Sequence, residues 1–213
     1  LERCLSVAEA VPGICAVMLS AFGWVESRFL EGTVAMLLDH SSPLRRRMGL
    51  LVCAIHRVDP GLVLESRIQD PDSKVRASAL QAAGELGRHD LLQRCMASLS
   101  DADPECQFWA AWSAVLLGDR SRALEKLTTI GQAPEPQKGM AFQLTLQATG
   151  ATHTLLQRLS KEPARLRKLI HGSGIAGDPA YIPWLISHMA DQKAARLAGE
   201  AFSLVTGVDL RAT

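Results

Sequence analysis

The chain has 213 residues, of which 47% are hydrophobic and 21% are charged, and its formal net charge is +1. This composition is typical of a folded globular protein, and the near-neutral balance gives no overall attraction to nucleic acid or to an anionic membrane. The five cysteines are widely spaced and form no C-x-x-C pair, which argues against a disulfide framework or a zinc site. We therefore expect a cytoplasmic protein with reduced cysteines and no metal or other cofactor.

The first segment, residues 1–38, is predicted to form a pair of helices interrupted near Gly23 and Trp24. Its longest apolar stretch, residues 11–24, contains Pro12 and is too short to cross a bilayer, so no membrane partner is expected. The chain begins without a methionine or a signal-peptide pattern, and it ends without a polar capping helix. We therefore expect a fragment of a longer protein.

The strongest pattern is a phrase that recurs every 31 residues. DPDSKVRASALQAAGELG at 70–87 returns as DADPECQFWAAWSAVLLG at 101–118, and a weaker copy, DHSSPLRRRMGLLVCAIH, occupies 39–56. A fixed period of this size is typical of repeat arrays, in which each unit buries its apolar face against its neighbours.

Each repeat is predicted to fold as two helices. In the copy at 70–87, Val75, Ala79 and Ala83 fall on one helical face, and Gly87 is suited to end the helix. A second apolar stripe follows at 91–99. More degenerate copies are expected over 132–150, 163–177 and 191–207. The whole chain, residues 1–213, is predicted to form a single all-α domain, a right-handed solenoid of about 13 helices without strands.

The repeat pattern D-P-x-x-x-V-R-x-x-A-x-x-A-x-x-x-L-G resembles short HEAT-like repeats. Longer phrases, CAIHRVDPG, RASALQAAGELGR, FWAAWSAVLLGDR, GDPAYIPWLI and AGEAFSLVTGVDL, are similar to a proteobacterial family of HEAT-repeat proteins often encoded beside type VI secretion genes. The resemblance implies an accessory role in that secretion system, such as an effector-loading adaptor. It brings no catalytic residues.

In HEAT-like arrays an Asp and an Arg often bond between adjacent repeats. The resemblance implies a structural ladder of this kind, and the aligned positions are Asp70, Arg45, Arg76 and Arg196. Gln107 departs from the pattern, because it stands where the ladder Arg would be.

Patterns that carry chemistry are missing from the sequence. The six histidines include no His-Glu dipeptide and no pair three or four residues apart, and there is no G-x-S-x-G elbow or phosphate-binding loop. The phrase HGSG at 171–174 is expected to lie at the end of a repeat helix, where glycine serves as a stop or as a close contact. We therefore expect no enzymatic activity and no catalytic residue.

Four residues are candidates for binding a partner. Trp109 and Trp112 share one helix, and Trp112 aligns with Gln81 at an expected groove position, although both rings can instead pack between repeats. Arg46 and Arg47 belong to a run of three arginines at a helix start, where they oppose the helix dipole. They either point into solvent or meet an acidic partner.

These observations favour a non-enzymatic scaffold, adaptor or chaperone that binds another protein, with no nucleic-acid partner. An immunity protein that blocks a toxin is an alternative, since it would also be a binder. The other alternative is a HEAT-like enzyme that acts on nucleic acid or on a bound cofactor, which would require a basic cleft with a carboxylate beside Trp109 or Trp112.

Overall fold

The structure is a computed structural model that describes residues 2–11, 13–132 and 152–210. Within these residues it contains 13 α-helices, with turns and short 3-10 helices between them, and no β-strand. The prediction of an all-helical chain is therefore confirmed for the described residues. Contacts divide the chain into two compact units, Leu1–Lys126 and Leu127–Thr213, and each is described by itself. The single domain over 1–213 stays a prediction.

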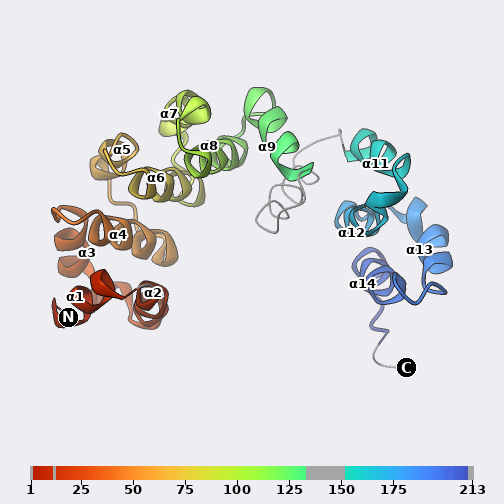
Figure 1. Cartoon of the computed structure of the whole chain (residues 1–213), viewed down its shortest axis with the longest axis horizontal. Coiled ribbons are helices and arrows are strands. Elements are labelled where there is room, and N and C mark those ends of the chain that lie inside the picture. The colour runs from red at the N-terminus through yellow and green to blue at the C-terminus, as the bar shows by residue number, and fades with distance from the viewer. Residues whose placement is uncertain (1, 12, 133–151, 211–213) are drawn as a thin grey trace. The chain divides into compact units, whose positions relative to one another are not determined.

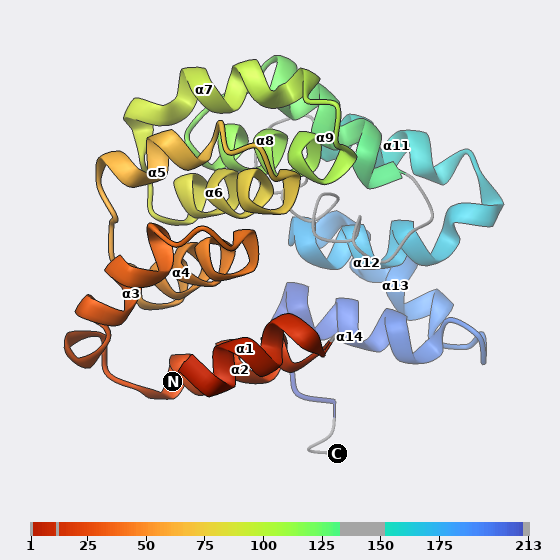
Figure 2. The same cartoon turned by 60° about the vertical axis from the view of Figure 1, so that its left-hand side comes forward.

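The first unit is built from four helix pairs. The pairs are α1 (Glu2–Ala10) with α2 (Ile14–Trp24), α3 (Glu31–Leu38) with α4 (Pro43–His56), α5 (Leu62–Arg67) with α6 (Ser73–Glu85), and α7 (Leu92–Ala97) with α8 (Pro104–Leu116). The second helix of each pair packs on the second helix of the next pair, so that α2, α4, α6 and α8 form a layer. Figures 1 and 2 show this inner layer in the first unit, with α3, α5 and α7 outside it.

Three of the second helices begin with the same turn, and this turn sets the register of the repeats. Their N-cap residues are Ser42, Asp72 and Asp103. Two residues before each N-cap, a side chain accepts a hydrogen bond from the N-cap backbone N–H, and the three acceptors are His40, Asp70 and Asp101. Such side-chain acceptors satisfy backbone groups that would otherwise lack partners at a helix start.

The same three helices end alike, in a left-handed residue that closes two backbone hydrogen bonds. After α6 this residue is Gly87, with φ 68°, and Arg88 N donates to Ala83 O at 3.0 Å. After α4 the equivalent residue is Arg57, with φ 53°, and its side chain makes the left-handed backbone less favourable than it is for glycine.

The inner layer is held together by close packing of small residues. A Cβ on Gly84 of α6 would lie 2.7 Å from the Cα of Ser113 in α8, so only glycine allows the two helices to approach this far. Ser113 Oγ donates a hydrogen bond of 2.6 Å to Leu80 O in α6. The first two helix pairs share a core of buried apolar side chains, which are Leu5, Phe22, Leu30, Leu37, Met48 and Val52.

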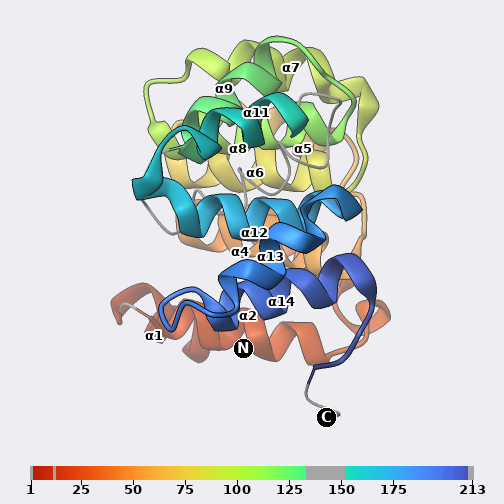
Figure 3. The ribbon, with the colours of Figure 1, turned by 90° about the vertical axis from the view of Figure 1, so that its right-hand side faces the viewer.

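The second unit continues the two-helix pattern. After α9 (Arg122–Gln132), which begins in the first unit, it contains α11 (Thr152–Ser160), α12 (Leu166–Ala176), α13 (Ile182–His188) and α14 (Ala195–Thr206). α12 packs on α14, as Figure 3 shows, and a Cβ on Gly174 would lie 2.8 Å from the Cα of Ala201. The helix expected over 132–150 lies almost wholly outside the described residues.

None of the described helices is long and apolar enough to cross a membrane.

Candidate functional site

Buried charges connect successive repeats of the first unit. Arg46 in α4 donates from Nε and Nη2 to the two carboxylate oxygens of Asp70, at 2.8 Å each. One repeat later, Arg76 in α6 donates in the same way to Asp101, at 3.0 Å each. The remaining Nη1 of each arginine donates to carbonyl oxygens of the loop before its own helix. Each guanidinium therefore ties its own repeat to the next one.

These arginines change the acidity of their partners. Hydrogen bonds from Arg76 are the main cause of the lowered pKa of Asp101. Burial alone would raise the pKa of Asp70, but hydrogen bonds from Arg46 and from the backbone N–H of Asp72, together with nearby positive charge, hold it below its usual value. Both carboxylates are therefore ionised at neutral pH.

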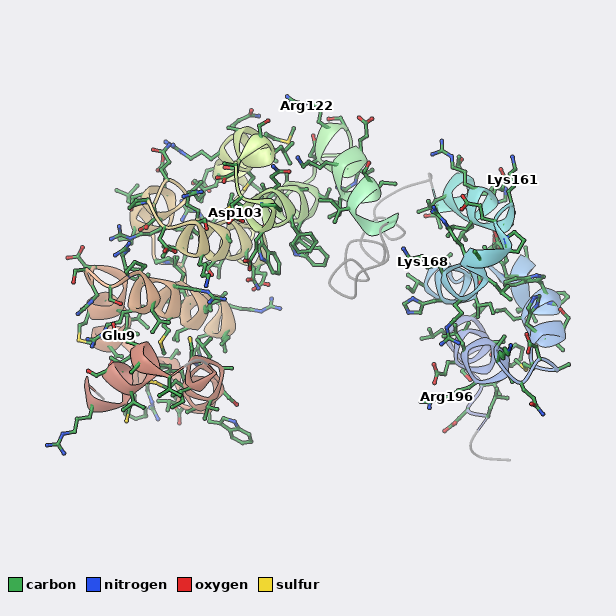
Figure 4. The ribbon with its side chains drawn as sticks, in the orientation of Figure 1. Glu9, Asp103, Arg122, Lys161, Lys168 and Arg196 are labelled. Atoms are coloured by element: carbon green, nitrogen blue, oxygen red, sulfur yellow. The ribbon has the colours of Figure 1, made fainter. Side chains whose placement is uncertain are left out.

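The ladder position of the first repeat is occupied by Arg46, not by Arg45 as the 31-residue alignment predicts. The N-cap residues Ser42 and Asp72 are 30 residues apart, so an alignment with a fixed spacing of 31 residues is displaced by one position at α4. Arg45 bonds the preceding neighbour instead, since its Nε donates to Oε1 of Glu9 in α1 at 3.0 Å. Glu9 is labelled in Figure 4.

Arg196 does not join a ladder either. Asp191 accepts a hydrogen bond from Lys193 N, and Ala195 N donates to Asp191 O, so Ala195 takes the register position that Arg76 holds in α6. Arg196 pairs with Glu200 of its own helix at 2.9 Å, and its side chain is 93% exposed (Figure 4).

Aromatic side chains gather on α8. The ring centroids of Phe108 and Trp109 are 4.9 Å apart, and that of Trp112 lies 6.1 and 6.2 Å from the two others. All three side chains are half-buried, whereas Ala110 and Ser113 on the packed side of the helix are fully buried. Trp112 Nε1 is buried and has no hydrogen-bond partner within the described part of the chain. The cluster thus presents large apolar area at the surface and holds one unsatisfied donor beneath it.

The positions of the aromatic cluster have equivalents on the other helices of the inner layer. When the three helices are aligned on their N-caps, Trp112 and Leu116 of α8 correspond to Gln81 and Glu85 of α6, and to Leu51 and Ile55 of α4. We call these positions, together with Trp109, the inner surface; its residues are Leu51, Ile55, Gln81, Glu85, Trp109, Trp112 and Leu116. They are half-buried or exposed in all three helices, so they face away from the packed core.

Of the four predicted partner-binding residues, the structure brings three to the inner layer with some accessibility. Trp109 and Trp112 belong to the inner surface, and the half-buried Arg47 donates to Ser78 Oγ at 3.3 Å. Arg46 is only 7% exposed and is fully occupied by the ladder, so it offers no contact to a partner. Sequence reasoning missed Leu51, Ile55 and Leu116, although alignment on the N-caps would have found them.

The cysteines and other metal-binding side chains are dispersed. Among the described residues, no three His, Cys, Asp or Glu side chains are placed to hold a metal ion. Burial raises the pKa of Cys53 to about 11 and the pKa of Cys95 and of Cys106 to about 12, so these thiols are protonated at neutral pH.

Comparison with known families covers the middle of the chain. Residues 62–142 match the family model for HEAT repeats. This part of the chain is a HEAT repeat region. The HEAT repeat region includes α5 to α9, and with them the Arg76–Asp101 pair and the aromatic cluster of α8. No curated protein sequence matches the chain at a significant level.

Proposed function

We propose that the chain is a non-enzymatic scaffold that binds another protein through the inner surface. HEAT repeats are typically protein-binding scaffolds, and this general role is the starting point. The observation that carries the proposal is the aromatic cluster of α8, which combines three half-buried rings with the unsatisfied N–H of Trp112.

Such a cluster has the physical character of an interface hot spot. Tryptophan supplies a large, rigid contact area, and it is enriched among residues whose truncation weakens complexes most. A buried donor without a partner costs about 1 to 3 kcal/mol, and a carbonyl or carboxylate of a bound protein would remove that cost if the indole of Trp112 turned on binding and brought Nε1 to the surface. A partner would therefore gain apolar contact here, and it would gain a hydrogen bond as well if Trp112 turned on binding.

The charged groups of the first unit support a binding role rather than catalysis. Asp70, Asp101, Arg46 and Arg76 are all bound in the ladder, and the buried thiols are protonated. The only charged residue of the inner surface is Glu85, which accepts a hydrogen bond from Gln81 at 2.8 Å. This arrangement favours a protein partner over a nucleic acid.

The proposal also includes the kind of protein that is bound. Because the phrases of the sequence resemble a family encoded beside type VI secretion genes, we propose an effector or an apparatus component of that system as the partner, met in the cytoplasm. An immunity role would use the same surface against a toxin. Growth rescue of cells that express a neighbouring toxin gene would separate the immunity role from that of an adaptor.

The test begins with a pull-down of the products of neighbouring genes, followed by titration of the captured protein. Trp112→Ala is expected to weaken the complex at least about tenfold, which corresponds to about 1.4 kcal/mol. Trp112→Phe keeps most of the ring but removes the donor, so it measures the contribution of the indole N–H. Trp24→Ala is the matched control, because Trp24 is 88% exposed and lies on α2, outside the inner surface. Equal affinity of the Trp112 and Trp24 variants would overturn the proposed surface.

A further inference from the structure

A groove in the first unit lies away from the inner surface. It is bounded by α3, by the C-terminal half of α4 and by the loop that leads into α5, and its volume is about 570 Å³. Figure 2 shows α3 and α5 as successive outer helices with α4 beside them. Pockets of about 300 to 1,000 Å³ are typical of ligand sites in proteins, so this groove is large enough to hold several side chains.

The groove exists because small residues meet where two repeats join. Ala35 of α3, Cys53 of α4 and Gly61 before α5 line it, and none has a side chain long enough to fill the space. Gly61 has φ 65° and ψ −134°, a backbone conformation open almost only to glycine, so this side of the groove is fixed by the backbone.

The interior of the groove is apolar. Leu30, Val34, Leu38, Val52 and Val63 contribute to its walls. The thiol of Cys53 stays protonated at neutral pH, because burial raises its pKa to about 11. The interior therefore favours an uncharged, apolar side chain.

The rim of the groove is acidic. Glu31, Asp39 and Asp59 are its charged residues, and no Lys or Arg lines it. Asp59 is bound by Arg88 at 2.7 Å, but Asp39 is 96% exposed and lies 3.7 Å from Arg67. Within the described residues Glu31 forms no ion pair. The rim therefore carries negative charge that is only partly neutralised, and it would attract a cation.

Apolar surface continues beyond the groove. Phe29, next to the lining residue Leu30, is 67% exposed, and Leu62, between the lining residues Gly61 and Val63, is 80% exposed. Exposed apolar area beside a pocket is typical of interaction sites. It also indicates a ligand that extends past the pocket, which a polypeptide segment does and a compact small molecule does not.

We propose that this groove is a second docking site, which takes a short partner segment carrying an apolar anchor beside a Lys or Arg. The anchor would fill the apolar interior, and the cation would lie at Glu31 and Asp39. This site goes beyond the proposed scaffold function for two reasons. It lies beside the outer helices α3 and α5 and not on the inner surface, and it selects a positively charged segment.

The experiment uses the whole chain and synthetic 12-residue peptides labelled with a fluorophore. A leucine–lysine peptide is compared with a leucine–glutamate peptide of the same leucine spacing, and with a serine–lysine peptide of the same charge. Fluorescence anisotropy is expected to show the leucine–lysine peptide binding at least about tenfold more tightly than either of the others. Equal binding of the leucine–lysine and leucine–glutamate peptides would overturn the proposal.

Two variants localise the binding. Ala35→Trp fills the groove and is expected to remove the binding of the leucine–lysine peptide. Glu31→Lys lies on the exposed rim, does not depend on repacking the groove, and is expected to weaken that binding at least about fivefold. Glu85→Lys reverses a carboxylate on the inner surface and is the matched control. If Glu31→Lys and Glu85→Lys have the same effect, the groove is not the site.

Two further measurements distinguish peptide binding in the groove from binding at the inner surface and from self-association of the chain. Trp112→Ala is expected to leave peptide binding unchanged, so a failure of the inner surface does not affect this test. Sedimentation of the unmodified chain and of Ala35→Trp examines a second copy as the occupant. A dimer that forms with the unmodified chain and is lost in Ala35→Trp would overturn the proposal, because the groove would then be a self-association site.

Discussion

Arg46 and Asp70 are 24 residues apart and lie in successive repeats, yet two hydrogen bonds of 2.8 Å join their side chains. The exposed fractions of the two side chains are 9% and 0%, so the pair is almost wholly removed from solvent. Because Arg46 also donates to His40 O and Ser41 O, it holds the loop before α4 and the loop before α6 at once.

Removal of Arg46 is expected to be strongly destabilising. Arg46→Met leaves the Asp70 carboxylate buried, and Arg67, at 3.5 Å, compensates only in part. We expect the free energy of unfolding to fall by about 3 to 5 kcal/mol, measured by urea titration. Arg196→Met, at an exposed pair within one helix, is the control and is expected to change it by less than about 0.5 kcal/mol. Similar losses in the two variants would contradict the role of the ladder.

The second ladder pair predicts a dependence of stability on pH. The folded pKa of Asp101 lies below its usual value, which is about 3.9 in an unfolded chain. The stabilisation by its charge is therefore fully present above that usual value, and it is lost as pH falls through the lowered folded pKa. Asp101→Asn is expected to be less stable than the unmodified chain at pH 7, and the gap in urea midpoint is expected to narrow as pH falls below about 4. A gap that stays constant would contradict this origin.

Two glycine substitutions are expected to have opposite effects on stability, because one glycine lies in the close contact between α6 and α8 and the other has open space around it. Gly84→Ala places a methyl group 2.4 Å from Ser113 Oγ and 2.7 Å from Ser113 Cα, so we expect a loss of about 1 to 3 kcal/mol. Gly32→Ala in α3 meets nothing within 4 Å, and the higher helix propensity of alanine is expected to stabilise by about 0.5 to 1 kcal/mol. Thermal unfolding of both variants measures the difference, and a mild effect of Gly84→Ala would show that α8 can move away.

Arg57 predicts a stabilising change. It is the non-glycine residue with positive φ among the described residues, and left-handed backbone costs a residue with a side chain about 1 to 2 kcal/mol. Arg57→Gly is expected to raise the free energy of unfolding by about 0.5 to 1 kcal/mol, after the higher entropy of glycine in the unfolded chain is subtracted. Gly87→Ala, at the equivalent position after α6, is expected to lower it by about 1 kcal/mol. The same sign of change in both variants would contradict the argument.

The helices and their repeat were predictable because local chemistry encodes them. Gly87 marks the end of α6, and apolar periodicity marks its buried face. The ladder register was harder to predict, since His40 replaces aspartate before Ser42 and offers Nδ1 to the same N–H. The nearest aspartate, Asp39, stands one residue before His40. An alignment that matches Asp39 with Asp70 is therefore displaced by one position.

The groove beside α3 could not be predicted from the sequence. It forms where Ala35, Cys53 and Val63 of two repeats meet, and none of these residues is unusual in its own helix. An unfilled volume depends on how far apart whole helices pack, which a pattern within one repeat does not encode. The inner surface was predictable only in part. Its tryptophans are recognisable in the sequence as candidate binding residues, whereas Leu51 and Ile55 are found only after the helices are aligned on their N-caps.

Gln107 takes the ladder position of α8, where it donates to Asp101 O at 2.6 Å without carrying a charge. In an array whose units are coupled only to their nearest neighbours, thermal fraying stops at the strongest junctions. The arginine–aspartate pairs of the ladder lie between α4 and α6 and between α6 and α8, which makes these three helices one cooperative block. Unfolding that starts on the C-terminal side of α8 would therefore stop at that helix. The aromatic cluster of α8 would then keep its native arrangement after the helices that follow it had unfolded.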